Sequence, residues 1–177
     1  MRSSRATRRL SAALLGAVVA AGLLSAGAAP ASAASARAVR QPLVPALLPE
    51  GDALAVEVLA LTNQARASAG CAPLAVADPL VAAAVEHSGE MAGAATLTHT
   101  GAGGSTPRTR LAALGVTPHR TAENVAVGAF TPRSLVDAWL ASPGHRRNLL
   151  DCRLGFVGIA RQDVAAGAYW TQVMAAA

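Results

Sequence analysis

The sequence predicts an α+β domain in which helices pack on a small antiparallel sheet. Two observations lead to this prediction. Apolar residues recur at helical spacing over the first part of the domain, and the long helical segments open with a capping residue or a proline. Short runs rich in β-branched and aromatic residues follow, and the last two are separated by a turn that contains glycine.

The first two helices have clear start signals. Asp52 lies where an N-cap belongs, and Gly70 follows the last residue of the first helical pattern. Asp78 and Pro79 repeat the start signal as a capping side chain and a first-turn proline, and this second helix is expected to run to about Gly93. The inward faces are Leu54, Val58, Leu61 and Ala65 in the first helix and Leu80, Ala84, His87 and Met91 in the second.

A glycine-rich loop is expected to follow the second helix. Segment 99–107 contains three glycines and begins at His99, so this imidazole lies on a loop, where functional groups are often found. Residues 108–115 then favour a short helix with Leu111 and Leu114 facing inward.

A third long helix and a second short one are predicted next. Thr131 and Pro132 form a cap and a first-position proline, and the helix is expected to end at Ser142. Ser142 also begins a new capping signal, which places His145 in the first turn of a short helix. The buried stripe of the long helix consists of Leu135, Val136, Trp139 and Leu140.

The last part of the chain is predicted to be a β-hairpin. Residues 156–160 and 169–174 are apolar and β-prone, and residues 165–167 supply the turn. Residues 125–127 are a further strand candidate. The few aromatic residues of the chain are expected to pack in the core.

The N-terminus predicts export. Four arginines precede an apolar run from Leu10 to about Leu24, and Ala31-Ser32-Ala33 fits the signal peptidase rule, so residues 1–33 are expected to be a signal peptide. The run is too short and too rich in alanine for a membrane-spanning helix, which needs roughly 20 apolar residues. We expect a secreted, soluble product that uses the general secretory route, with the twin-arginine route as the alternative.

Residues 34–49 contain three prolines among small residues and are expected to form a linker, which leaves residues 50–177 as one domain. Without the signal, eleven arginines face ten acidic residues. We therefore expect no nucleic-acid partner. We also expect a monomer, and no transmembrane anchor because the N-terminal apolar run is too short to span a membrane. Arg146 and Arg147 could contact an anionic envelope ligand, although a solvated helix face is the simpler interpretation.

The two cysteines are expected to form a disulfide. Cys71 and Cys152 both lie in the predicted domain, and exported small domains are commonly cross-linked. Closing a loop of about 80 residues would stabilise the fold by roughly 4 kcal/mol.

Three polar residues provide most of the chemistry, namely His99, Glu123 and His145. Two imidazoles and a carboxylate can hold a divalent metal, move protons or orient a polar ligand. Glu123 also has a structural interpretation, in which its carboxylate and the amide of Asn124 satisfy loop backbone groups. His87 is expected to be a core or surface histidine, since its neighbour on the helix does not face it.

Ordered motifs across the domain resemble those of the CAP superfamily, which includes cysteine-rich secretory proteins, antigen-five allergens and plant pathogenesis-related proteins. The motifs are ExLxLxNxxRxxxG (57–70), Pro73-Leu74, AxxHS (84–88), His99, AEN (122–124), WxxSPGHRxN (139–148), GxVGIA (155–160) and YWTQ (169–172). The closest similarity is to the short secreted bacterial members. The resemblance implies an α-β-α sandwich of the CAP type with an open central cavity.

The resemblance also implies which residues line that cavity. Fuller family members have two histidines and two acidic residues there; His99, Glu123 and His145 match three of these positions, and Ser142 stands where the second glutamate is usual. This departure counts against mechanisms that need paired carboxylates. The two-histidine arrangement that the family links with zinc is retained, so we expect a weak, exchangeable Zn²⁺ site on His99 and His145, with Glu123 as the candidate third ligand.

Three classes of function remain open. The leading hypothesis is a ligand-binding module, without demonstrated catalysis, that takes a lipid-like or cell-envelope molecule at His99, Glu123 and His145. The alternative is an extracellular hydrolase, either metal-assisted with Glu123 as general base or serine-type with Ser105 or Ser142 near His99. No GxSxG or HExxH motif supports it. The third hypothesis is a structural surface protein with a vestigial cavity.

Overall fold

The computed structural model describes residues 42–46 and 52–177. The predicted signal peptide, residues 1–33, and most of the predicted linker lie outside these residues. In the part described, no helix is long and apolar enough to cross a membrane.

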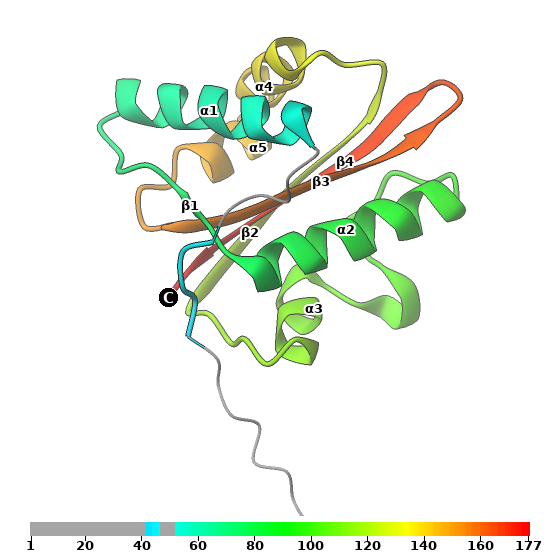
Figure 1. The fold of residues 1–177 in the computed structure, drawn as a ribbon, viewed down its shortest axis with the longest axis horizontal. Helices are drawn as coiled ribbons and strands as arrows, with labels where there is room; N and C mark the ends of the chain where they lie inside the picture. The colour runs from blue at the N-terminus through cyan, green and yellow to red at the C-terminus, as the bar shows by residue number, and fades with distance from the viewer. Residues whose placement is uncertain (1–41, 47–51) are drawn as a thin grey trace, which may run out of the picture. The chain divides into compact units, whose positions relative to one another are not determined.

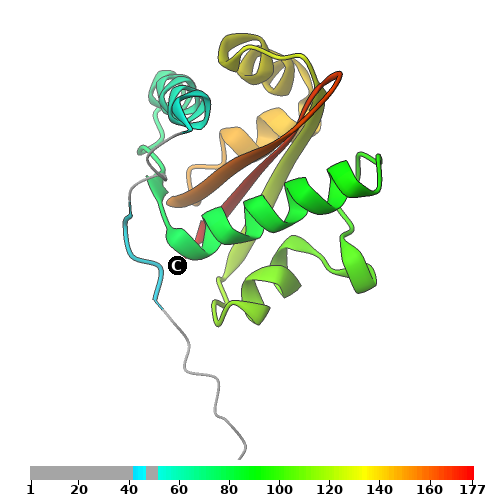
Figure 2. The ribbon, with the colours of Figure 1, turned by 45° about the vertical axis from the view of Figure 1, so that its right-hand side comes forward.

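A four-stranded sheet lies between two layers of helices (Figure 1, Figure 2). The strand order is β1-β3-β4-β2, where β1 is parallel to β3 and β4 is antiparallel to both β3 and β2. The strands are β1 (Ala75–Val76), β2 (Arg120–Gly128), β3 (Phe156–Val164) and β4 (Gly167–Ala176). The α+β class and the three-layer sandwich are therefore confirmed, as are the hairpin and the strand predicted around residues 125–127.

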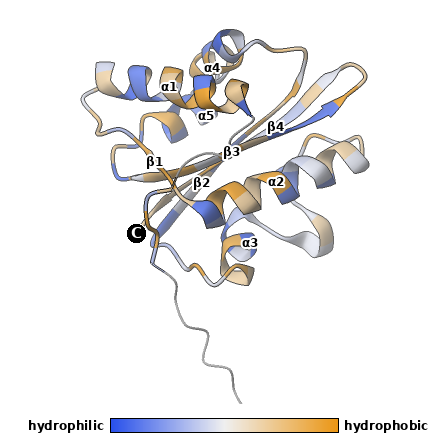
Figure 3. Cartoon of the chain, in the orientation of Figure 1, coloured by the Kyte–Doolittle hydropathy of each residue, from blue (hydrophilic) through white to orange (hydrophobic). Residues whose placement is uncertain are grey.

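The helices are divided between the two faces of the sheet (Figure 2). One layer contains α1 (Ala53–Ser68), α4 (Pro132–Ala141) and α5 (Pro143–Leu149). The other contains α2 (Asp78–Gly93), the short 3₁₀ turn η1 (Ala102–Gly104) and α3 (Pro107–Ala113). Hydrophobic and hydrophilic stretches alternate along α1 and α2, as expected for helices with one buried face (Figure 3).

The predicted ends of α1 and α4 are confirmed. The Asp52 carboxylate accepts a hydrogen bond from the backbone N–H of Ala55 at 3.0 Å. Gly70 follows the helix with a φ of +77°, a conformation that glycine adopts at little cost. Thr131 caps α4 and, together with Ser134, forms a reciprocal capping box.

Two predicted capping interactions are wrong. The N-cap of α2 is Ala77, so Asp78 and Pro79 occupy the first turn, where the Asp78 carboxylate faces the positive end of the helix dipole. Ser142 is the N-cap of α5, but its hydroxyl makes no capping hydrogen bond. His145 nevertheless lies in the first turn of α5, as expected.

Strand β4 is buried on both faces because it lies between two neighbouring strands and two helix layers. Its residues from Ala168 to Ala175 are all buried. On the α2 side the packing is especially close at Gly158 of β3, where a Cβ atom would lie 2.0 Å from the carbonyl carbon of Leu80. This contact gives the glycine in the middle of the GxVGIA motif a physical role.

The edge strand β1 was not predicted. It has only two residues, too few to show a periodic pattern, and pairing with β3 defines it. Ala46 adds an isolated bridge to Val76, with an N–O distance of 2.7 Å, and Leu43 is buried. Residues 42–46 therefore pack on the domain.

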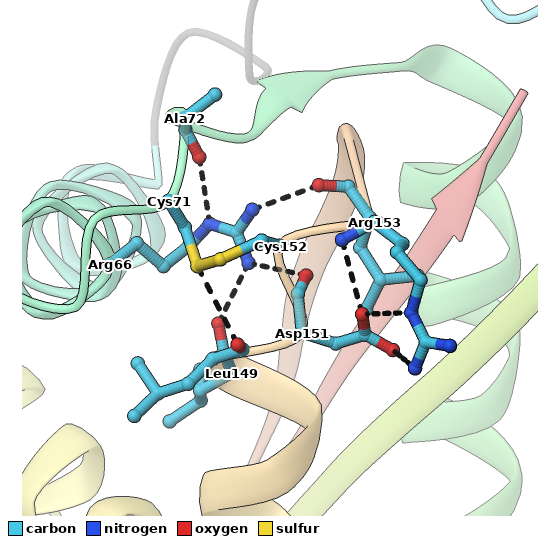
Figure 4. Close-up of a disulfide and its surroundings, with 9 residues drawn as sticks. Arg66, Cys71, Ala72, Leu149, Asp151, Cys152 and Arg153 are labelled. Carbon is cyan, nitrogen blue, oxygen red and sulfur yellow. Dashed lines mark hydrogen bonds and ion pairs between the residues drawn. A yellow bond between two sulfur atoms is a disulfide. The ribbon is translucent and has the colours of Figure 1, made fainter.

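The predicted disulfide between Cys71 and Cys152 is present and joins the end of α1 to the loop that follows α5 (Figure 4). The buried guanidinium of Arg66 lies beside it. Arg66 donates to the carbonyl oxygens of Leu149 and Leu154 at 2.8 Å and to that of Asp151 at 3.1 Å. Burial lowers the pKa of Arg66, and the Asp151 carboxylate partly opposes this effect. The side chain and the disulfide together fix the α5–β3 loop.

Candidate functional site

Strand β2 presents the two polar residues of the AEN motif to opposite faces of the sheet. Glu123 pairs with Val173 of β4, and Asn124 pairs with Gln172. Since successive side chains of a strand alternate between faces, Glu123 points towards α2 and α3, and Asn124 points towards α5. Adjacent residues therefore belong to different local networks.

The Glu123 carboxylate is buried, and each of its oxygens has a polar partner. Its Oε1 lies 2.9 Å from His99 Nδ1 and 3.8 Å from His87 Nε2. Its Oε2 accepts a hydrogen bond from the guanidinium of Arg110, which is also buried. A buried carboxylate is stable only when it is paired in this way.

His99 is the exposed member of this group. Its side chain is 55% exposed, whereas that of Glu123 is 2% exposed. Because Nδ1 faces the carboxylate, Nε2 remains available to a ligand or a proton. We refer to His87, Glu90, His99, Arg110 and Glu123 as the His99–Glu123 site.

His87 connects the site to a second carboxylate. This fully buried imidazole lies 3.1 Å from Glu90 Oε2 and 2.8 Å from the carbonyl oxygen of Thr98. Burial alone would raise the pKa of Glu90. Hydrogen bonds from His87 and the Ala102 amide, with the charges of His87 and Arg110, outweigh burial and lower this pKa.

The loop around η1 approaches these side chains closely. At Gly101 a Cβ atom would lie 2.2 Å from Glu90 Oε2 and 2.5 Å from the Ser105 hydroxyl, so a larger residue would push both side chains aside. Between α2 and segment 96–102 lies a cavity of about 440 Å³. It is lined by His87, Glu90, Met91, Ala94, Thr96, Thr98, Thr100, Gly101 and Ala102.

Asn124 holds α5 on the other face of the sheet. Its Nδ2 donates to Gln172 Oε1 at 3.1 Å and to the carbonyl oxygen of His145 at 3.4 Å. Asn148 of α5 donates to Asn124 Oδ1 and to the Glu123 carbonyl oxygen, both at 3.0 Å. The carboxamide therefore has the structural role considered for the AEN turn, whereas the Glu123 side chain belongs to the His99–Glu123 site.

His145 does not join Glu123 directly. It lies on α5, and its ring makes no hydrogen bond with the described residues. Burial lowers the pKa of His145, and the charge of His99 lowers it further. The His145 ring therefore favours the neutral form.

The serines considered for a hydrolase are placed elsewhere. Ser105 contacts the guanidinium of Arg110, and across the described ranges neither its hydroxyl nor that of Ser142 bonds to a histidine ring. Ser88, next to His87, donates to Thr171 Oγ1 at 2.9 Å on β4, so it packs α2 on the sheet. The expectation that His87 and Ser88 do not face each other is confirmed.

Among residues 42–46 and 52–177, no three His, Cys, Asp or Glu side chains form a group that could hold a metal ion. Both oxygens of the Glu123 carboxylate already have partners, with His99 at Oε1 and Arg110 at Oε2. The donors still open are the imidazoles of His99 and His145.

His87, Glu90 and Arg110 are the site residues that the sequence analysis missed, since His87 was expected to be only a core or surface histidine. Arg110 is next to the inward-facing Leu111, and Glu90 is one turn after His87 on α2. The three-residue spacing of His87 and Glu90 could have indicated their contact, because residues three apart on a helix are neighbours. Nothing in the sequence indicated that Arg110 pairs with Glu123.

The family comparison decides what kind of domain this is. The sequence model of the cysteine-rich secretory protein family, CAP, matches residues 59–174. The chain belongs to the CAP family. The uncharacterized protein YkwD of Bacillus subtilis (strain 168) is 31% identical to it over 116 residues, which are 66% of this chain and 44% of that protein. The chain thus spans less than half of this CAP relative.

Solved structures support the CAP fold. An outer surface protein of Borrelia burgdorferi has a TM-score of 0.63 and 23% identity, covering 67% of this chain and 89% of that one. An extracellular protein of Bacillus anthracis with an SCP domain has a TM-score of 0.62 and 24% identity, covering 69% and 40%. A cysteine-rich secretory protein of Staphylococcus aureus has a TM-score of 0.59 and 22% identity, covering 70% and 38%.

Proposed function

We propose that this CAP domain binds a small ligand at the His99–Glu123 site. One observation carries the proposal: the exposed His99 imidazole is held by a buried carboxylate that is itself fixed by Arg110. An anchored ring loses little freedom on binding, and its Nε2 can donate to or accept from a ligand.

The neighbouring cavity favours a lipid-like ligand. Its volume of about 440 Å³ lies in the range of small-molecule sites, roughly 300–1,000 Å³. Met91 and Ala94 contribute apolar lining, and Glu90, whose side chain is 23% exposed, contributes a polar group. A molecule with an apolar body and a polar end matches this combination.

Zinc would be an exchangeable partner of the two open imidazoles. With Glu123 committed to His99 and Arg110, the ion would depend on His99 and His145, with water completing its coordination. When bound, zinc would polarise that water. The lowered pKa of His145 keeps its ring neutral and able to coordinate near neutral pH.

We expect the protein to bind its ligand outside the cell. Relatives of similar fold are described as an outer surface protein and as an extracellular protein. Residues 1–33 have the pattern of a signal peptide.

Calorimetric titration tests the proposal with two probes, zinc chloride and oleate. We expect binding by the mature chain at about pH 7.5, and weaker zinc binding at about pH 5.5, where imidazoles with a reference pKa near 6.5 are protonated. His99→Ala should reduce oleate binding, and His99→Ala with His145→Ala should abolish zinc binding. His119→Ala, which changes an exposed histidine elsewhere, is the matched control. Binding of neither probe, or equal losses in the control, would contradict the proposal and favour a scaffold.

A hydrolase is the second candidate, because a histidine whose Nδ1 faces a buried carboxylate can act as a general base through Nε2. A water molecule would then be the nucleophile. Turnover of p-nitrophenyl esters or casein that is lost in His99→Ala and retained in His119→Ala would support this candidate. No turnover with or without added zinc would eliminate it.

A further inference from the structure

A groove separate from the His99–Glu123 site is lined by arginines. It lies where α5, the start of β2 and the α5–β3 loop meet, and its volume is about 620 Å³. Four arginines are among the residues that line it, namely Arg120, Arg146, Arg147 and Arg153. Asp151 is the one acidic residue in its lining. We refer to this feature as the arginine groove.

The charge of the arginine groove is not a general property of the domain. The described residues contain nine arginines and nine acidic residues, so their formal charges balance. The groove nevertheless gathers four of these arginines around a single aspartate. A local excess of three positive charges on a balanced domain attracts anions to one place.

Two of the four arginines form ion pairs with Asp151. Arg153 lies 2.7 Å from Asp151 Oδ1, and Arg120 lies 3.6 Å from Asp151 Oδ2. The hydrogen bond from Arg153 contributes most to the lowered pKa of Asp151, which therefore stays ionised. Asp151 thus holds Arg120 and Arg153 in place and neutralises one charge.

The other two arginines remain available. Arg146 and Arg147 are exposed on α5 and form no ion pair with the described residues. Both residues line the groove, and two cations without an acidic partner there favour an anion that carries more than one negative charge.

One segment that lines the groove is cross-linked to the rest of the domain. The segment that carries Asp151 and Arg153 is linked to α1 by the Cys71–Cys152 disulfide, and Arg66 bonds three carbonyl oxygens in and beside this segment (Figure 4). A ligand that binds there meets groups that are already positioned, so less ordering cost opposes binding.

We propose that the arginine groove binds a phosphate-bearing anion, with Arg146 and Arg147 as its direct contacts. The fork of a guanidinium matches the geometry of phosphate oxygens, and several guanidinium groups suit an anion that carries more than one charge. The groove volume admits a ligand of small-molecule size. Soluble phosphate esters and phospholipid headgroups share this chemistry.

The first test is calorimetric titration of the mature chain with inorganic pyrophosphate at low ionic strength. We expect saturable binding that weakens with added salt, and a loss of about tenfold in affinity for each of Arg146→Gln and Arg147→Gln. Arg133→Gln is the matched control, since it removes the same charge from exposed residue 133 on α4, outside the groove. Circular dichroism and thermal melting check that the variants fold.

Vesicle sedimentation separates the two sources of the phosphate group. Binding to phosphatidylglycerol vesicles over phosphatidylcholine vesicles, competed by pyrophosphate and reduced by Arg146→Gln, supports a headgroup ligand. Pyrophosphate binding without vesicle binding supports a soluble phosphate ester. Binding of neither probe, or equal losses in Arg133→Gln and the groove variants, would overturn the proposal.

Discussion

At the scale of single residues, Glu123 shows how position decides the role of a side chain. It is next to Asn124 in the sequence, yet the two side chains lie on opposite faces of β2 and have different partners. The carboxylate can remain buried because His99 and Arg110 contact one oxygen each. The pair with Arg110 is therefore expected to matter for stability as well as for positioning His99.

Replacing Arg110 with alanine should destabilise the fold strongly. The change leaves the Glu123 carboxylate buried without its cation, and breaking a buried pair in this way costs about 3–5 kcal/mol of unfolding free energy. Urea unfolding measures the effect. Arg108→Ala is the control, because Arg108 is exposed and bonds only the carbonyl oxygens of Pro118 and His119 among the described residues. Equal stabilities of the two variants would show that the buried pair contributes little.

At the scale of secondary structure elements, the close approach of α2 to β3 organises this side of the sandwich. Helix α2 brings His87 and Glu90 to the site, and Gly158 of β3 allows its backbone to approach the sheet. The position of the two side chains relative to Glu123 thus depends on a residue that has no side chain.

Gly158→Ala should disturb the packing of α2. A methyl group 2.0 Å from a backbone carbon of Leu80 forces the helix away from β3, and overpacking of this kind costs about 1–3 kcal/mol or more. The midpoint of urea unfolding gives the size of the loss. Gly155→Ala is the matched control, because its Cβ would meet no atom within 4 Å. If Gly155→Ala proved as harmful, the packing argument would be wrong.

At the scale of the whole molecule, three titrating groups should make stability fall in acid. The pKa of His145 is lowered from 6.5 in the folded state, so the unfolded chain binds more protons as the pH falls through about 6.5. The pKa values of Glu90 and Asp151 are lowered from 4.5 and 3.8. These carboxylates stabilise the fold above those values and stop doing so as the pH falls through their folded pKa values.

Unfolding free energies measured from neutral pH down to about pH 3 test this expectation. We expect a first decline beginning near pH 6.5, which His145→Asn should remove, and a second decline in the range of the carboxylates. His119→Asn should keep the first decline. An unchanged first decline in His145→Asn would show that another group causes it.

The sequence predicted most of the secondary structure because the signals involved are local. Helical spacing and the Asp52 and Thr131 caps placed α1 and α4, and the hairpin followed from two β-prone runs around a turn. Strand β1 was missed because its two residues are defined by pairing with β3. The prediction that Asp78 caps α2 was wrong because aspartate is favoured both at the N-cap and in the first turn of a helix.

The sequence alone was enough to predict the fold class, the disulfide and His99 and Glu123 as candidate site residues. These predictions rest on hydrophobic periodicity, the number of cysteines and the ordered motifs, all of which are properties of the sequence itself. Three relations could be recognised only in the folded molecule. Arg110 pairs with Glu123, His145 lies in the helix layer of α1 and α4, away from the layer that contains α2, and four arginines line one groove. These relations join segments distant in sequence, and their distances depend on how helices and strands pack, which no local pattern records.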